Sequence, residues 1–132
     1  MSSNDGTIHN ISDAEIEILL VLWETSPQSA EEIINSLQQH RTAHPKTIKT
    51  LINRLLNKKA LGFHEKNRKY HYYPLVDKTD FYNHKTDTFL QRFFGGQLTP
   101  LVSFFSEKKK LSSQDLKQLK ALIKTMEADN DK

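Results

Sequence analysis

Two short polar patterns mark the starts of the first two predicted helices. Ser12-Asp13-Ala14-Glu15 and Ser29-Ala30-Glu31-Glu32 each place a serine three positions before a glutamate, which is the arrangement of a helix-capping box. Apolar residues then recur at the spacing of a half-buried helix, and Pro27 ends the first segment. The predicted inward positions are Ile16, Leu19, Leu20 and Trp23 in the first helix, and Ile33, Ile34 and Leu37 in the second.

A third amphipathic helix is predicted to start at Pro45, because proline is favoured where its missing N–H costs no helical hydrogen bond. We expect it to fade near Lys59, with Gly62 reversing the chain. One face is apolar and consists of Ile48, Leu51, Ile52, Leu55 and Leu56. The other face is polar and consists of Lys46, Thr47, Lys49, Thr50, Asn53, Arg54 and Asn57.

The hydrophobic period changes after this helix. Phe63–Lys66 and Lys69–Leu75 are rich in aromatic residues that favour strands, and Asn67-Arg68 between them suits a tight turn. The pattern predicts a small two-stranded hairpin.

Helical spacing returns in the last third of the chain. Asp77 or Thr79 is expected to cap a helix that ends at Gly95-Gly96. Leu98 to Phe105 forms a short apolar segment, and a cap at Ser112 or Ser113 starts the last helix.

The predicted fold class is mainly α with a small β-hairpin. The order helix, helix, basic helix and hairpin is that of a winged helix-turn-helix, which we place at residues 11–76. A helical dimerisation region follows at residues 77–128. Disordered tails are expected at residues 1–10 and 129–132.

Charge is segregated along the chain, although the formal net charge of the 132 residues is only +3. Residues 1–40 carry −7, residues 41–69 carry +8, and the remainder carries +2. A strongly basic central third indicates a surface that faces a polyanion. Nucleic acid is the first candidate partner, and an anionic membrane surface is the second.

The polar face of the third helix has the residue types that read base edges in the DNA major groove. Lysine and arginine donate to guanine, asparagine pairs with adenine, and a threonine methyl can touch thymine. We therefore expect Lys46, Thr47, Lys49, Thr50, Asn53 and Arg54 to face DNA. Lys66, Arg68 and Lys69 on the hairpin are expected to meet phosphates.

The C-terminal third has more large apolar side chains than a short appendage can hide. Together with the last helix, they can form an extra layer on the same subunit or a dimer interface. One winged helix also covers few base pairs, so two copies that read half-sites of double-stranded DNA are favoured. We expect a homodimer interface formed by Phe89, Leu90, Phe93, Phe94, Leu98, Leu101, Val102, Phe105, Leu119, Leu122 and Ile123.

Several strings in this order resemble the penicillinase repressor (BlaI/MecI) family of bacterial transcriptional regulators. They are Ile11–Glu15, Val21–Trp23, Ser29-Ala30, Gly95-Gly96, Leu101-Val102 and, most specifically, Pro45-Lys46-Thr47-Ile48-Lys49-Thr50-Leu51-Ile52-Asn53-Arg54-Leu55. The resemblance implies a winged-helix homodimer that represses transcription from a palindromic operator. It also implies that Lys46, Thr47, Lys49, Thr50 and Arg54 face DNA.

The sequence departs from the family pattern at two places. Typical members are inactivated by a sensor protease at an Asn-Phe bond after the Leu-Val pair, and this chain has Ser103-Phe104 there. Copper-responsive relatives carry a cysteine cluster, and this chain has no cysteine. The usual proteolytic switch is therefore not supported by the sequence, and a copper-thiolate sensor is excluded.

Catalysis and cofactor binding are not predicted. Without cysteine there is no disulfide, thiolate site or cysteine nucleophile. His64 and His71 can be neighbours across the hairpin, but no carboxylate or thiolate clusters with them to complete a metal site.

The predicted setting is the cytoplasm, without a membrane partner, because the chain shows neither a secretory signal nor a membrane span. The alternative to DNA binding is a protein–protein module whose basic face docks an acidic partner. A variant within the DNA-binding class is a repressor that binds an effector in its aromatic C-terminal region.

Overall fold

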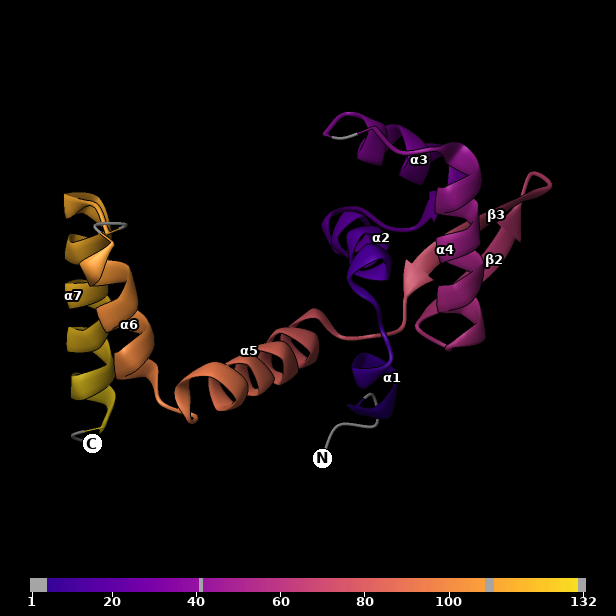
Figure 1. The fold of residues 1–132 in the computed structure, drawn as a ribbon. Helices are drawn as coiled ribbons and strands as arrows, with labels where there is room; N and C mark the ends of the chain where they lie inside the picture. The colour runs from indigo at the N-terminus through magenta and orange to yellow at the C-terminus, as the bar shows by residue number, and fades with distance from the viewer. Residues whose placement is uncertain (1–4, 41, 109–110, 131–132) are drawn as a thin grey trace. The chain divides into compact units, whose positions relative to one another are not determined.

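The computed structural model describes residues 5–40, 42–108 and 111–130, and its helices and strands follow the predicted order (Figure 1). The mainly helical fold with a β-hairpin is confirmed. The elements are α1 (Asp5–His9), α2 (Asp13–Glu24), β1 (Gln28–Ser29), α3 (Ala30–Gln38), α4 (Pro45–Asn57), β2 (Leu61–Lys66), β3 (Lys69–Pro74), α5 (Lys78–Phe94), α6 (Leu98–Glu107) and α7 (Ser113–Asn130).

The chain divides into two units after Lys85. We call the part up to Lys85 the winged-helix unit and the part from Thr86 the C-terminal unit. The division lies nine residues beyond the expected boundary at residue 76, because Phe81 near the start of α5 is buried in the core of the winged-helix unit.

The predicted capping boxes form and explain where α2 and α3 begin. The N–H of Glu15 donates to Ser12 Oγ at 3.2 Å, and the N–H of Ser12 donates to Glu15 Oε1 at 2.7 Å. Ser29 and Glu32 make the same reciprocal pair at 3.3 and 3.0 Å. Each box satisfies N–H groups that the first turn of a helix leaves without partners.

The buried face of α2 is displaced by one position from the predicted stripe. Ile18, Leu19 and Leu22 are buried, whereas Leu20, which we expected to face inward, is 37% exposed. Glu15 at the start of the helix is buried on this same face, whereas Ile16 is only half-buried.

A three-stranded antiparallel sheet with the order β1-β3-β2 completes the winged-helix unit. The predicted hairpin forms with Lys66 opposite Lys69, and the backbone at Asn67 and Arg68 has positive φ of 55° and 65°. Two consecutive residues of this kind form a turn whose twist matches that of the paired strands. The short strand β1 was not predicted.

The chain reverses after α4 at Lys59, with φ of 62°, and not at Gly62 as expected. Gly62 lies within β2 opposite Tyr73 instead. A Cβ atom there would come within 2.6 Å of the Tyr73 ring, so the glycine makes room for that ring.

The predicted disordered tails are wrong for the described residues at both ends. Residues 5–9 form α1, where Ile8 is fully buried, and α7 continues to Asn130. Isolated apolar residues in a polar segment give a weak sequence signal, but Ile8 and Ile11 join the core. The rest of the predicted tails, residues 1–4 and 131–132, lies outside the described residues.

In the C-terminal part, α5 begins and ends, and α7 begins, at the predicted signals. Asp77 accepts a hydrogen bond from the N–H of Asp80 at the start of α5, and Gly95 and Gly96 with φ of 60° and 80° follow its end. Ser112 caps α7 by accepting from the N–H of Asp115 at 3.0 Å. Within the described residues, no helix has both the length and the apolar character that are needed to cross a membrane.

Candidate nucleic-acid interface

The exposed face of α4 is the first part of the candidate site. Ile48, Ile52 and Leu55 are buried, which fixes the rotation of the helix about its axis. As a result, all six residues that we expected to face DNA are exposed: Lys46, Thr47, Lys49, Thr50, Asn53 and Arg54. The helix contains no Asp or Glu, so this face is purely cationic and polar.

Local hydrogen bonds set the beginning of α4. His44 precedes the helix, and its Nδ1 accepts from the N–H of Lys46 at 3.1 Å. The Thr50 hydroxyl donates to the Lys46 carbonyl at 3.0 Å. The hydroxyl proton of Thr50 is therefore already used, which leaves its methyl group as the feature suited to a thymine contact.

The second part is the wing, which consists of β2, β3 and the turn between them. Lys66, Arg68 and Lys69 are all exposed, as phosphate contacts require. Lys69 differs from the other two because its Nζ lies 3.4 Å from Glu31 Oε2 in the first turn of α3. This ion pair could not be predicted, since its two members are 38 residues apart in the sequence.

Aromatic side chains pack along the wing. The rings of Phe63 and Tyr70 are 4.5 Å apart, and Tyr72 beside them is buried. Burial raises the pKa of the Tyr72 hydroxyl, and Tyr70 adds to this effect. Like an ordinary tyrosine, this group is uncharged at neutral pH and does not oppose DNA binding.

His64 and His71 lie opposite each other across the hairpin, as expected, with ring centroids 6.1 Å apart. No group of three or more His, Asp or Glu side chains suited to a metal ion occurs among the described residues. The pair by itself lacks the third and fourth ligands of a structural metal site.

A buried ion pair anchors the far end of α4. Glu15 is 1% exposed, and its Oε1 accepts from Lys58 Nζ at 2.6 Å. The same ammonium donates to the Asn10 carbonyl at 2.7 Å. Burial acts to raise the pKa of Glu15, but hydrogen bonds from Lys58 and Ser12 outweigh it, so the pKa lies below its usual value. Lys58 thus serves the fold and is not available to DNA.

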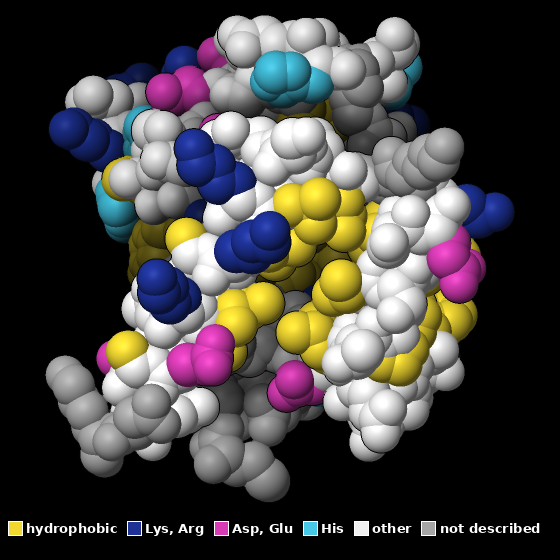
Figure 2. Space-filling model, turned by 90° about the vertical axis from the view of Figure 1, so that its left-hand side faces the viewer, with side chains coloured by type: hydrophobic (Ala, Val, Ile, Leu, Met, Phe, Trp, Pro, Cys, Tyr) yellow, Lys and Arg dark blue, Asp and Glu magenta, His cyan; other side chains and the backbone are white. Residues whose placement is uncertain are grey.

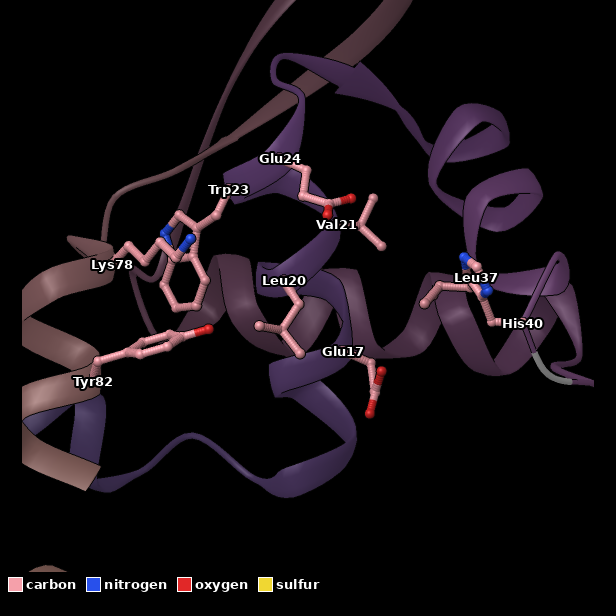
Figure 3. A pocket seen from close by; sticks show the side chains of 9 residues that line it. All are labelled: Glu17, Leu20, Val21, Trp23, Glu24, Leu37, His40, Lys78 and Tyr82. Carbon is pink, nitrogen blue, oxygen red and sulfur yellow. The ribbon is translucent and has the colours of Figure 1, made fainter. Parts of the chain in front are cut away.

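A groove of about 340 Å³ opens on another face of the winged-helix unit (Figure 3). Trp23 and Tyr82 lie at one end and His40 at the other, with Leu20 between them. The Trp23 indole N–H donates to the Val76 carbonyl at 3.0 Å, which fixes the start of α5 beside α2. None of the lining residues belongs to α4 or the wing.

The C-terminal unit exposes the apolar residues that we expected in a dimer interface. Neither α6 nor α7 has a buried residue within the described range, and Phe93, Leu98 and Leu122 are 63%, 60% and 56% exposed. Figure 2 looks onto these helices and shows hydrophobic side chains gathered in a hollowed band. The remaining predicted interface residues, Phe89, Leu90, Phe94, Leu101, Val102, Phe105, Leu119 and Ile123, are all exposed or half-buried.

Ser103 and Phe104, at the family's cleavage position, are exposed on α6. They lie inside the helix Leu98–Glu107 and not in an extended segment.

Comparison with known proteins agrees with this architecture. The penicillinase repressor of Bacillus licheniformis is 37% identical over 116 residues, which cover 88% of this chain and 91% of that protein. The methicillin resistance regulatory protein MecI of Mammaliicoccus sciuri is 33% identical over 119 residues, which cover 90% and 97%. The solved DNA-binding domain of the repressor BlaI is 41% identical with a TM-score of 0.50, covering 55% of this chain and 89% of that one.

Residues 11–125 match the family described as penicillinase repressor. The resemblance drawn from the sequence is therefore confirmed, and the chain belongs to the penicillinase repressor family.

Proposed function

We propose that this protein is a sequence-specific DNA-binding transcriptional repressor that acts as a homodimer on a palindromic operator. The observation that carries the proposal is the exposed face of α4, which is rich in cations, threonine and asparagine and lacks any carboxylate. Membership of the penicillinase repressor family supports it, as does the similarity to a DNA-binding domain. No catalytic step is part of this function.

In the proposed complex, α4 enters the major groove, which is about 12 Å wide and admits one helix. Lys46 and Arg54 donate to guanine, and Asn53 pairs with adenine. Thr47 and Thr50 present methyl groups to thymine. The wing lies along the DNA backbone beside that groove. There Lys66 and Arg68 contact phosphates, which positions α4 without recognising the base sequence.

The C-terminal unit supplies the second half of the proposal. Its exposed apolar side chains favour burial against another surface. A second copy of the same surface buries them in a two-fold symmetric interface. Two winged-helix units then read half-sites about one helical turn of DNA apart, or a multiple of it. Occupied operator DNA excludes polymerase, which is the proposed mechanism of repression in the cytoplasm.

Cleavage between Ser103 and Phe104 by a sensor protease is not part of the proposal. The bond lies within α6, so a protease would have to unwind the helix to reach it. The asparagine of typical family members is also absent.

The proposal is tested by selecting bound sequences from a pool of random DNA duplexes at several salt concentrations. We expect a palindrome with two half-sites and an affinity that falls steeply with salt. Binding without sequence enrichment, or enrichment of a single half-site only, would contradict the proposed dimeric reading.

Alanine variants assign the reading residues on the selected palindrome. Arg54→Ala and Lys46→Ala are each expected to cost about 1–3 kcal/mol on the palindrome and much less on scrambled DNA. An equal loss on both DNAs would show that the residue contacts phosphate and does not read bases.

A further inference from the structure

A small hollow lies between α4, the wing and the start of α3. It has a volume of about 220 Å³, and its lining includes Lys49 from α4, Lys69 and Tyr70 from β3, and Glu31 from α3. Two lysines from different elements therefore line one space. A phosphodiester group is an anion that both ammonium groups can contact, and DNA carries one at every nucleotide.

The position of Lys49 on α4 agrees with this role. Successive helical residues are turned by about 100°, which places Lys49 toward one side of the exposed face that is centred on Lys46, Thr50 and Asn53. Its side chain borders the hollow beside the wing. Lys49 is thus placed to contact the DNA backbone and not to read base edges at the centre of the major groove.

Glu31 competes for the same space. Its carboxylate lies 3.4 Å from Lys69 Nζ, and the two side chains are 76% and 59% exposed. The neighbouring Glu32 is used differently, since it accepts from the N–H of Ser29 in the capping box. Glu31 is not part of the capping box. Its charge in the first turn also favours the helix dipole, and its carboxylate reaches Lys69.

We propose that Glu31 is a built-in competitor of the DNA backbone, because it holds Lys69 at a hollow that receives one phosphate between Lys69 and Lys49. This inference rests on the proposed function. A phosphate and the Glu31 carboxylate cannot approach the same ammonium without repelling each other, so DNA binding parts the ion pair. An exposed ion pair is weak enough to open. The free energy lost when it opens nevertheless reduces the free energy of DNA binding by the same amount for every base sequence.

The test compares Glu31→Gln with Glu24→Gln, which removes the same charge from α2 at the groove of Figure 3. The probes are a duplex with the selected palindrome and a scrambled duplex of equal length. Glu31→Gln is expected to tighten binding to both duplexes by about two- to fivefold, the range of an exposed ion pair. Glu24→Gln changes binding much less. Equal effects of the two variants would overturn the proposal.

A double-mutant cycle shows whether Glu31 acts through Lys69. In the Lys69→Gln background, Glu31→Gln is expected to have no more effect than Glu24→Gln. An undiminished gain in that background would mean that Glu31 repels DNA directly, and the proposed competition would be wrong.

The phosphate site itself is tested with Lys49→Gln. We expect equal weakening on both duplexes and a salt slope that is flatter by about 0.9, as for one lost phosphate contact. A loss confined to the palindrome would make Lys49 a base-reading residue and overturn the site. These outcomes are separate from failure of the proposed function, in which the unaltered protein itself would not prefer the palindrome.

Discussion

Among individual side chains, Glu15 has the least usual position, because it carries a charge into the core of the winged-helix unit. An unpaired carboxylate there would be strongly unfavourable. Lys58 compensates from the end of α4, and Ser12 adds hydrogen bonds from the capping box. Glu15 Oε2 has no hydrogen-bond partner among the described residues, so the carboxylate depends on contacts to its other oxygen.

The ion pair should make stability depend on pH. The pKa of Glu15 is lower in the folded protein than in the unfolded chain, so the stabilisation is fully present above the unfolded pKa. It is lost as the pH falls through the folded pKa. Glu15→Gln is expected to lower the free energy of unfolding at pH 7 by about 1.5–3 kcal/mol, the range of a hydrogen bond to a charged group. The same variant should lose less stability than the unaltered protein on acidification.

Urea unfolding at neutral pH and at about pH 4 measures both effects. Glu24→Gln on the same helix is the control and should change the free energy of unfolding by less than about 0.5 kcal/mol. If Glu15→Gln lost as much stability on acidification as the unaltered protein, the pH dependence would have to come from another group.

Partnerships of this kind could not be predicted from the sequence. Glu15 and Lys58 are 43 residues apart, and Glu31 and Lys69 are 38 apart. The capping pattern correctly placed Glu15 at a helix start, but nothing local shows that its side chain turns inward. In contrast, the exposure of Lys46 and Arg54 was predictable, because a regular helical period assigns every position to a face.

Among helices and strands, the turn of the wing combines a backbone cost with a cation that we propose to contact DNA. Arg68 has positive φ, a conformation that costs a residue with a side chain about 1 kcal/mol or more. Glycine adopts it without that cost. The arginine is therefore expected to be useful for its charge and not for its fit to the turn.

Arg68→Gly separates the two contributions. We expect the free energy of unfolding to rise by about 0.5–1 kcal/mol, because the turn is relieved of strain. DNA binding should weaken to the same extent on palindromic and scrambled duplexes, with a salt slope flatter by about 0.9.

Arg68→Lys is the matched variant for this experiment, since it keeps both the charge and the strain. It should bind DNA nearly as the unaltered protein does. Unchanged binding by Arg68→Gly would remove Arg68 from the phosphate contacts.

The elements that were predicted are those with local signals. Capping boxes, Pro45 and the Gly95-Gly96 pair act within a few residues, so the helix boundaries near them were correct. The strand β1 was missed because its two residues form a strand only by pairing with β3, whose sequence lies more than 40 residues away. The chain reverses at Lys59 and not at Gly62 as expected, and Gly62 lies in β2 opposite Tyr73.

Taken as a whole protein, the chain pairs a unit that has a core with one that exposes its apolar side chains. The buried residues of the core cluster end at Phe81, and the described helices α6 and α7 bury none. The C-terminal unit is therefore expected to gain its core from a second copy. Its thermal midpoint should rise with protein concentration, since association stabilises the folded state by mass action.

Leu122→Asp tests this association. The side chain is 56% exposed in one protomer, so the substitution is tolerated by a monomer but places a carboxylate in the proposed interface. We expect the dissociation constant of the dimer, measured by sedimentation equilibrium, to rise at least about 100-fold. Affinity for the palindrome should fall toward that for a single half-site.

Ala121→Asp adds the same charge at an adjacent exposed position that is turned away from Leu122, Ile123 and Met126. It should leave the dimer intact. If both variants stayed dimeric, the predicted apolar interface would not be the one that joins the protomers.

Trp23 gives the protein a built-in optical reporter. It is the only tryptophan of the 132 residues. Its indole N–H donates a hydrogen bond to the Val76 carbonyl, and its ring centroid lies 5.2 Å from that of Phe81. Ultraviolet emission excited at the indole band therefore comes from the contact between α2 and the first turns of α5. Separation of two protomers along the interface proposed on α6 and α7 is expected to leave this emission unchanged, whereas melting of the winged-helix unit is expected to shift it to the red. Measuring tryptophan fluorescence and sedimentation together thus distinguishes dissociation of the dimer from unfolding of the winged-helix unit.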